Sequence, residues 1–324
     1  MKRIVVETPG GPEQMKVVEA PKPVAGPKDA VVKVAFSGVN FIDVYFRTGL
    51  YKAEVPIALG SEASGTVDST GSEVTDVKPG DRVAYTMVRG SYAEYAAVPA
   101  AQLVKVPDGV DLKTAAAVML QGTTAHYLTH STYKLERGST CLVHAAAGGT
   151  GGLIVQMAKH LGARVFGTVS SEDKARQVRD LGADEAIIYT TQDFEVEVKR
   201  LTNGKGVDVV YDSVGKTTFD KSLNVLRPRG TMALFGQSSG VVPPFDPAIL
   251  NAKGSLFLTR PTLAHHLLDR KELLWRVSDV FGDIASGAVK VRVSGIYPLA
   301  EAASAHEVLE GRRTLGKLLL KVGD

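Results

Sequence analysis

A run of small residues, Val143-His144-Ala145-Ala146-Ala147-Gly148-Gly149-Thr150-Gly151-Gly152, has the composition of a turn that binds phosphate groups. It follows the short apolar segment 141–143 and precedes Leu153, Met157 and Leu161 at helical spacing, which predicts a strand, a turn and a helix. Small side chains at Ala146, Gly148 and Gly151 allow backbone amides to approach a pyrophosphate, with alanine in the first glycine position of the usual pattern. The same residues also suit a simple loop, so the turn needs its context.

That context is an alternation of strands and helices. Apolar runs of strand length are found at 164–169, 186–189, 207–212, 230–235 and 255–258. Helical patterns separate most of them, at 172–181, 194–201 and 218–226. Such a series predicts a doubly wound parallel sheet, a Rossmann domain at about 123–262 that binds a dinucleotide at its first turn.

The end of the second predicted strand indicates which dinucleotide binds. A site for NAD usually has an acidic side chain there, for the ribose 2'-hydroxyl. This chain has Ser170 and Ser171, followed by Glu172 in the first turn of a helix and by Lys174. Two hydroxyls and an ammonium suit a 2'-phosphate, so we predict NADPH; the alternative is that Lys174 is an ordinary solvated helix residue.

Composition limits the classes of function. The 324 residues carry 38 basic and 35 acidic side chains, a net charge of +3, which is too small to indicate a nucleic-acid surface. No apolar stretch approaches the roughly 20 residues that cross a bilayer, and no secretory signal is recognisable, so we expect a cytoplasmic protein without a membrane partner. The single cysteine, Cys141, lies in an apolar strand and is expected to be an inert core thiol.

The two ends of the chain have a different pattern from its middle. Residues 1–122 contain short strand-like segments separated by Pro and Gly, typical of a small barrel or bent sheet. Residues 263–324 contain a helical stripe from Leu273 to Ile284, then strands at 291–296 and 317–322 around a helix at 300–309. These late strands need a sheet to join. We therefore predict an α/β protein in which 1–122 and 263–324 form a β-rich catalytic domain and 123–262 is inserted.

The order of several motifs resembles the medium-chain dehydrogenase/reductase superfamily. Ser37-Gly38-Val39-Asn40-Phe41-Ile42-Asp43 and Gly60-Ser61-Glu62-Ala63-Ser64-Gly65 precede the small-residue turn. Within the superfamily the chain is similar to NADPH:quinone oxidoreductases of the zeta-crystallin type, through the stretches 120–125, 211–215, 235–240 and Thr259-Arg260-Pro261. The resemblance covers nearly the whole chain and implies a GroES-like fold for the catalytic domain.

The resemblance also shows which metal ligands this chain lacks. Zinc-dependent relatives have a Cys near position 40 and a His in a Gly-His-Glu turn, where this chain has Asn40 and Ser61. One cysteine cannot form a four-thiolate structural site, and the seven histidines show no metal-ligand spacing; His265 and His266 are expected at a helix start. We predict no zinc. Without a metal to polarise an alcohol, an electron-poor acceptor such as a quinone is favoured.

The resemblance implies two groups of site residues. Asn40, Tyr45 and Tyr51 are the candidate catalytic side chains, with Asn40 and Tyr51 as polar contacts for the acceptor, and Phe41, Ile42, Asp43 and Tyr45 are expected near the nicotinamide and its ribose. The remaining cofactor contacts are expected at Tyr127, Ala146, Gly148, Gly149, Thr150, Gly151, Ser170, Lys174, Tyr189, Ser213, Phe235, Gly236, Arg260 and Arg312. Structural alternatives exist: Asn40 as a helix cap, Asp43 as a turn residue, the tyrosines as packing, and Arg312 as a surface charge.

Three further hypotheses concern the acceptor and the partners of the protein. An enone or alkenal double-bond reductase would share the fold, the cofactor and the lack of metal, and the sequence does not separate it from a quinone reductase. A structural or RNA-binding NADPH protein is disfavoured, because the charge balance is near neutral and no aromatic-basic stripe is present. A homodimer is expected from pairing of the strand at 255–258 across a two-fold axis.

Overall fold

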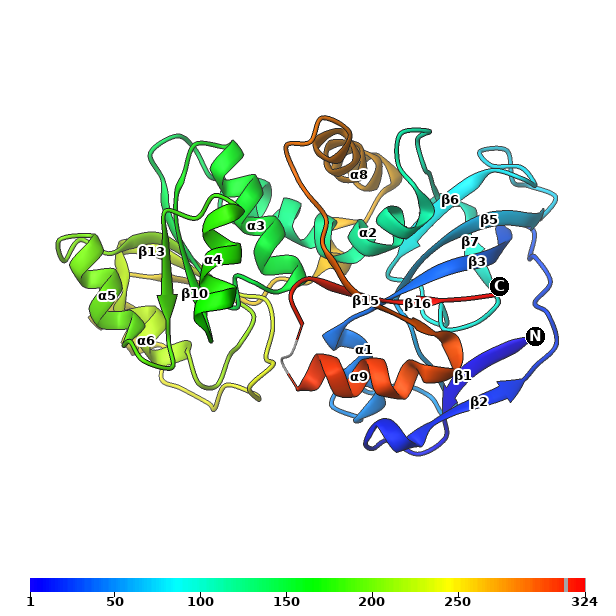
Figure 1. Cartoon of the computed structure of the whole chain (residues 1–324), viewed down its shortest axis with the longest axis horizontal. Helices are drawn as coiled ribbons and strands as arrows, with labels where there is room; N and C mark the ends of the chain where they lie inside the picture. The colour runs from blue at the N-terminus through cyan, green and yellow to red at the C-terminus, as the bar shows by residue number, and fades with distance from the viewer. Residues whose placement is uncertain (312–313, 324) are drawn as a thin grey trace. The chain divides into compact units, whose positions relative to one another are not determined.

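The computed structural model describes residues 1–311 and 314–323 (Figure 1). The chain divides into two compact units. Unit 1 comprises Met1–Thr123 and Leu267–Asp324, and unit 2 comprises Thr124–His266. Unit 1 contains two sheets and unit 2 contains one, and each unit has its own buried core.

Unit 2 is built on a six-stranded parallel sheet with the order β11-β10-β9-β12-β13-β14. The strands are β9 (Thr140–Val143), β10 (Arg164–Val169), β11 (Glu185–Ile188), β12 (Val207–Asp212), β13 (Leu226–Leu234) and β14 (Phe257–Thr259). The chain moves outward from β9 to β11 and then returns to the other side of β9 with β12. The carboxyl ends of β9 and β12 therefore mark the topological switch point, where open α/β sheets bind ligands.

Helices connect these strands. They are α3 (Gly149–His160), α4 (Glu172–Asp180), α5 (Phe194–Leu201), α6 (Phe219–Asn224) and α7 (Ala248–Ala252), and α2 (Leu112–Tyr127) enters unit 2 from unit 1. Two of the helices that lie wholly within unit 2, α4 and α5, are capped by the side chain of their N-cap residue: Ser171 accepts a hydrogen bond from the amide of Lys174, and Asp193 accepts one from the amide of Glu195. Such caps satisfy first-turn amides that have no partner within the helix.

Unit 1 contains a three-stranded sheet, β2-β1-β4, and a seven-stranded sheet with the path β15-β16-β3-β5-β6-β8, in which β7 also pairs with β3. The strands are β1 (Lys2–Val6), β2 (Met15–Glu19), β3 (Asp29–Val39), β4 (Ile57–Ala58), β5 (Glu62–Thr70), β6 (Arg82–Thr86), β7 (Tyr95–Pro99), β8 (Val104–Lys105), β15 (Val293–Pro298) and β16 (Lys317–Lys321). The helices of this unit are α1 (Phe41–Arg47), α8 (Arg270–Ala285), α9 (Ala302–Glu310) and the first part of α2.

The last strand of the chain joins the first long strand of unit 1. In β16, Leu318 pairs antiparallel with Val39 and Leu320 with Ser37, so β16 lies between β15 and β3 (Figure 1). Leu318, Leu319 and Leu320 are all buried, which explains an apolar run without alternation. The prediction of an α/β protein whose β-rich domain is formed by both chain ends is confirmed.

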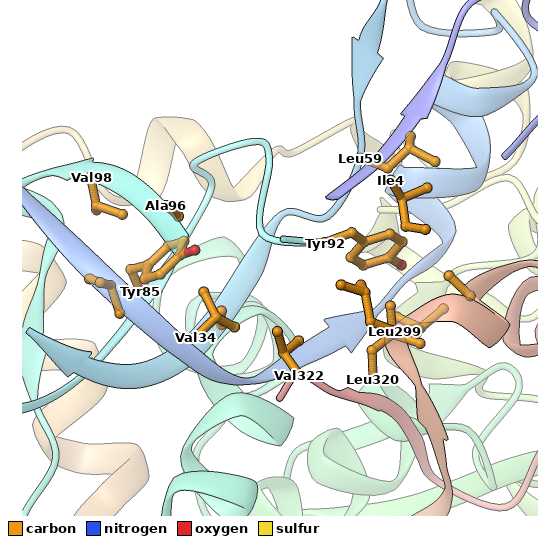
Figure 2. Close-up of a cluster of buried hydrophobic side chains, with 14 of the residues drawn as sticks. Ile4, Val34, Leu59, Tyr85, Tyr92, Ala96, Val98, Leu299, Leu320 and Val322 are labelled. Atoms are coloured by element: carbon orange, nitrogen blue, oxygen red, sulfur yellow. The ribbon is translucent and has the colours of Figure 1, made fainter. Parts of the chain in front are cut away.

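The core of unit 1 contains two buried tyrosines among aliphatic side chains. Figure 2 shows Tyr92 near Ile4, Leu59, Leu299 and Leu320, whereas Tyr85 lies near Val34, Ala96 and Val98. Both rings are fully buried. They differ in their hydroxyl groups: Tyr92 is hydrogen-bonded, while Tyr85 Oη has no partner among the described residues.

Local geometry shifts several predicted boundaries. The strand predicted at 255–258 is β14, which begins at Phe257 because Ser255 has the left-handed φ of 56°. The helix predicted at 218–226 ends at Asn224, because Leu226 already pairs with Val207 in β13. The expectation that His265 and His266 start a helix is wrong: they end a 3-10 turn, Leu263–His266, and the following helix α8 is capped by Asp269.

Candidate functional site

Most predicted cofactor residues in unit 2 follow the carboxyl ends of its parallel strands. Ala146 and Gly148–Gly151 follow β9, Ser170 and Lys174 follow β10, Tyr189 follows β11, Ser213 follows β12, Phe235 and Gly236 follow β13, and Arg260 follows β14. Since parallel strands end at one edge of a sheet, these residues share that edge.

The turn after β9 is compact because its side chains are small. Ala145 has the left-handed φ of 51°, and Gly148 donates its amide hydrogen to the carbonyl of Ala145 at 2.9 Å. A Cβ on Gly151 would overlap the carbonyl oxygen of Ala145 and come within 3.0 Å of its carbonyl carbon. Gly151 therefore permits a close fold of the chain that alanine would disturb.

The turn leads into the N-terminus of α3. Gly148 is the N-cap without a side chain to accept a hydrogen bond, and the first amide with a helical carbonyl partner is Gly152, which donates to Gly148. The amides of Gly149, Thr150 and Gly151 precede that bond and belong to the first turn, where amides lack helical partners. The N-terminus of this twelve-residue helix therefore offers amide donors and a favourable dipole to an anion.

A buried polar cluster supports the same edge of the sheet. His144, directly after β9, bonds through Nδ1 to Thr168 Oγ1 and through Nε2 to Ser222 Oγ, each at 2.9 Å. Asp212, the last residue of β12, accepts hydrogen bonds from the amides of Val214 and Gly215 at 2.7 and 3.0 Å. Burial lowers the pKa of His144, so its ring is neutral. The cluster fixes the loops after β9 and β12.

The ends of β10 and β11 carry the residues predicted to select the cofactor. Tyr189 donates its amide hydrogen to the carbonyl of Val169, and Thr190 donates its hydroxyl to the carbonyl of Ser170, so these two loops are adjacent. The side chain of Tyr189 is 44 % exposed. Two carboxylates stand in the first turn of α4, Glu172 and Asp173, and Glu172 is paired with Arg179 at 2.9 Å on the exposed surface of the helix.

The remaining cofactor candidates differ in how they are held. Tyr127 is buried at the end of α2 and stacks on His266, with ring centroids 4.2 Å apart. Arg260 donates a hydrogen bond to the carbonyl of Leu234 at 3.1 Å. Gly236 lies against Ser213, because an added Cβ would come within 2.6 Å of the Ser213 carbonyl oxygen. Arg312 lies outside the described residues.

In unit 1 the candidate residues gather on α1, on its N-cap Asn40, and at Tyr51, which follows the helix and packs against it. The backbone amide of Asn40 donates to Asp43 Oδ2 at 3.2 Å, so both structural alternatives considered for these residues occur. Phe41, Tyr45 and Tyr51 form a ring cluster in which Tyr45 lies 6.2 Å from Phe41 and 5.2 Å from Tyr51, between centroids. Ile42 shares the first turn of α1 and is partly buried.

The amide side chain of Asn40 is held by a buried ion pair. Lys317 pairs with Glu62 Oε1 and donates to Asn40 Oδ1 at 2.7 Å, while Asn40 Nδ2 donates to Glu62 Oε1 at 2.8 Å. The amide of Leu120 binds Glu62 Oε2 at 2.6 Å, and Gly38 leaves room for the carboxylate. Burial lowers the pKa of Lys317, an effect that the Glu62 carboxylate opposes. A buried pair of this kind requires all its hydrogen bonds.

Asp43 is the second buried carboxyl group near α1. Its Oδ1 accepts a hydrogen bond from Ser61 Oγ at 2.6 Å, and its side chain is 1 % exposed in total. Burial raises the pKa of Asp43 to about 7, although the Ser61 hydrogen bond and the charge of Lys317 act against this rise. Asp43 therefore titrates near neutrality.

Neither unit contains the donor set of a metal site among its described residues. No group of three or more His, Cys, Asp or Glu side chains within 1–311 and 314–323 could hold a metal ion. Cys141 is buried in β9, and burial raises the pKa of its thiol, so it is held as an inert core thiol. No helix of the described chain has the length and apolar character needed to cross a bilayer.

Comparison with known proteins assigns the two units to a common class. Residues 26–108 match the profile of the alcohol dehydrogenase GroES-like domain, and residues 149–269 match that of the zinc-binding dehydrogenase. Together these are the two domain types of the medium-chain dehydrogenase/reductases.

Individual relatives narrow the class. A quinone oxidoreductase of Pseudomonas aeruginosa is 45 % identical over 98 % of this chain and 99 % of its own, and a 2-haloacrylate reductase of a Burkholderia species is 43 % identical over 98 % and 97 %. The structure of Escherichia coli quinone oxidoreductase in complex with NADPH has a TM-score of 0.97, with 41 % identity over 99 % of this chain and 100 % of that chain. The chain belongs to the zeta-crystallin-like quinone oxidoreductase family.

Several residues at these sites were not predicted from the sequence. In unit 2 these are His144 and Asp212, although an acidic residue that ends an apolar strand just before a glycine loop was a usable signal for Asp212. In unit 1 they are Glu62 and Lys317, which are 255 positions apart in the sequence and meet only through the pairing of β16 with β3.

Proposed function

We propose that this protein reduces quinones or other electron-poor acceptors with NADPH, without a metal. The observation that carries the proposal is the carboxyl edge of the unit 2 sheet, where a small-residue turn precedes the open first-turn amides of α3. The family relatives support it, since one of them is a quinone oxidoreductase complexed with NADPH.

The residues present fit the parts of such a cofactor. The amides of Gly149, Thr150 and Gly151 would hold the pyrophosphate, as donors at a helix N-terminus. Ser170, Lys174 and Tyr189 would hold the 2'-phosphate, and the two carboxylates of the first turn of α4, Glu172 and Asp173, are paired with Arg179 and Arg176. Ser213, Phe235, Gly236 and Arg260 would line the remaining edge, where the Asp212 and His144 cluster fixes the loops.

Unit 1 would provide the acceptor site on α1. NADPH supplies a hydride to the acceptor when it is bound. Phe41, Ile42 and Tyr45 would orient the nicotinamide end, and Tyr51 would contact the acceptor. Asn40 would mainly give the acceptor site a fixed shape, because its side-chain Nδ2 and Oδ1 are both hydrogen-bonded inside unit 1. Catalysis would then depend on orientation and on hydrogen bonds to the reduced acceptor.

The side chains at the positions of the zinc ligands support the proposal of a reaction without zinc. Asn40 and Ser61, which occupy the positions of the ligands in zinc-dependent relatives, are engaged by Lys317 and Asp43. A buried ammonium beside Asn40 would repel a divalent cation. Elemental analysis of the purified protein tests this proposal, and stoichiometric zinc would overturn it.

A double-bond reductase is the second candidate for the same site. The observation that favours it is the 43 % identity to a 2-haloacrylate reductase over nearly the full length. The two activities use the same cofactor site and differ in the acceptor. Steady-state rates with NADPH on a panel of quinones and a panel of enones and 2-haloacrylates separate them, and calorimetric titration with NADPH and NADH tests the cofactor. Absence of binding by either nucleotide would refute both candidates.

An outermost strand of the unit 2 sheet, β14, supports the proposal of a homodimer. β14 is an edge strand, and its Phe257 side chain is 62 % exposed. An exposed apolar edge strand is a site for pairing with another strand. A second copy of β14 is the partner that a two-fold axis would supply.

A further inference from the structure

A chain of hydrogen bonds connects Asp43 to helix α9 inside unit 1. Tyr92 Oη donates to Asp43 Oδ2 at 3.4 Å and lies 3.0 Å from His306 Nε2. His306 Nδ1 lies 3.0 Å from Arg47 Nη1, and Arg47 Nη2 pairs with Glu310 at 2.8 Å. Arg47 and His306 are buried, whereas the side chain of Glu310 is 34 % exposed.

The hydrogen bonds of this series all run in one direction, from Arg47 toward Asp43. A guanidinium only donates hydrogen bonds, so His306 Nδ1 must accept from Arg47. Burial and the Arg47 charge lower the pKa of His306 to about 3, so the ring is neutral and its one proton is on Nε2. His306 therefore donates to Tyr92 Oη, and the Tyr92 hydroxyl is left to donate to Asp43.

This direction determines where a proton on Asp43 would lie. Oδ2 accepts hydrogen bonds from Tyr92 and from the amide of Asn40. Among the described residues, the other oxygen, Oδ1, has the hydroxyl of Ser61 as its only hydrogen-bond partner, at 2.6 Å. The protonated carboxyl would carry its hydrogen on Oδ1 and donate it to Ser61 Oγ. A hydroxyl can accept one hydrogen bond and donate another, and Ser61 Oγ has no second partner among the described residues.

We propose that Asp43 and Ser61 form a proton-donating couple for the reduced acceptor, and that Tyr92, His306 and Arg47 are positioning residues that fix its direction. The proposal rests on the proposed function, because the reduction of a quinone or an enone consumes one proton for each hydride. None of the residue roles predicted from the sequence accounts for the source of this proton.

The atoms balance as follows. The acceptor gains a hydride from the reduced nicotinamide and holds the negative charge on oxygen. Ser61 Oγ gives its hydrogen to that oxygen, forming the new O–H bond, and takes the hydrogen from Asp43 Oδ1. Asp43 becomes a carboxylate that Ser61, Tyr92 and the Asn40 amide stabilise by hydrogen bonds. A proton from water restores the carboxyl group before the next turnover.

The charges around Asp43 are consistent with a group that gains and loses a proton. Lys317 on β16 favours the carboxylate, and Glu62 on β5 disfavours it. Arg47 on α1 is paired with Glu310 on α9, and His306 is neutral. Burial is the dominant influence and raises the pKa of Asp43 to about 7. The donor form is therefore present below about pH 7 and is lost above it.

The first test uses the cofactor-free protein and two matched tyrosine variants. Carbon-13 NMR of labelled aspartate, with Asp43→Asn to assign the signal, gives the titration midpoint of the Asp43 carboxyl. We expect a midpoint near 7 in the wild type. Tyr92→Phe removes one hydrogen-bond donor to the Asp43 carboxylate and should raise the titration midpoint by roughly 0.5 to 1 pH unit. Tyr85→Phe removes a buried hydroxyl without a described partner and should leave it unchanged.

A wild-type midpoint near 4 would overturn the proposal, as would equal shifts in the two tyrosine variants. Both phenylalanine variants keep the ring and its packing, so their melting temperatures report whether unit 1 remains folded.

The second test measures turnover. With saturating NADPH and an acceptor that the wild type reduces, kcat should fall as the pH rises through the Asp43 midpoint. In Asp43→Asn this dependence should be lost, and Ser61→Ala should lower kcat roughly 100-fold while the dissociation constant for NADPH stays within about twofold. A pH-independent wild-type kcat, or a Ser61→Ala variant with wild-type kcat, would refute the couple. Failure of the wild type to bind NADPH would instead refute the proposed function.

Discussion

Asp43 makes the stability of unit 1 depend on pH. In the unfolded chain an aspartate has a pKa of 3.8, whereas burial raises it to about 7 in the folded protein. Below pH 4 both states hold the proton. Between about 4 and 7 only the folded state holds it, so the free energy of unfolding falls as the pH rises. Above 7 the folded state carries the full cost of a buried charge.

The magnitude follows from the two pKa values. A difference of about 3 in pKa, at 1.36 kcal/mol each, corresponds to at most about 4 kcal/mol between pH 4 and pH 8. Asp43→Asn removes the charge. Its amide can donate to Ser61 through Nδ2 and accept from the Asn40 amide through Oδ1, as the protonated carboxyl does. We therefore expect the variant to be more stable than the wild type at pH 8, and the difference to shrink toward pH 4.

Unfolding in urea measured at several pH values provides the assay. The single tryptophan, Trp275, lies in α8 of unit 1, so its fluorescence follows the unfolding of that unit. Asp108→Asn, at an exposed position of the same unit, is the matched control and should keep the wild-type slope. If Asp43→Asn also keeps the wild-type slope of stability against pH, Asp43 is ionised throughout and the reasoning from burial is wrong.

Three further predictions concern unit 2. Gly151→Ala should weaken NADPH binding at least tenfold by calorimetry, since its Cβ would overlap the Ala145 carbonyl. Lys174→Glu should lower the ratio of NADPH to NADH affinity roughly tenfold or more, measured by parallel titrations, because it places a negative charge beside the 2'-phosphate. Phe257→Asp should convert a dimer to a monomer in light scattering, because it charges the exposed edge of β14.

Matched variants separate these effects from general damage. Gly109→Ala adds a Cβ with no atom within 4 Å and should bind NADPH normally. Lys205→Glu changes the same charge at an exposed position of unit 2 and should keep the wild-type cofactor preference. A wild-type affinity in Gly151→Ala, an unchanged preference in Lys174→Glu, or a wild-type protein that is monomeric throughout would each contradict the corresponding prediction.

The features that could be predicted from the sequence are local ones. The turn at Ala146–Gly151 and the strands around it show their structure through spacing within a few residues, because strands and helices impose short periods on apolar residues. The β-rich domain formed by both chain ends required one inference beyond this, namely that the late strand at Lys317 must join an existing sheet.

The buried polar contacts of unit 1 could not be predicted in this way. Tyr92 and His306 are 214 positions apart, and Asn40 and Lys317 are 277 apart. Their meeting depends on the register between strands and on the position of α9, which no local pattern encodes. Lys317 also stands at the start of an apolar strand, where a lysine usually reaches solvent; here Glu62 and Asn40 hold it inside.

The pairing of β16 with β3 has a consequence for how the protein is made. Unit 2 is one continuous segment, so it can fold as soon as the ribosome has released it. The sheet of unit 1 must wait for β15 and β16, which are translated about 250 residues after β3. Until then the edge of β3 that pairs with β16 stays open, and the carboxylate of Glu62 lacks its lysine partner. The nascent amino-terminal segment is therefore the part of the chain most in need of a chaperone.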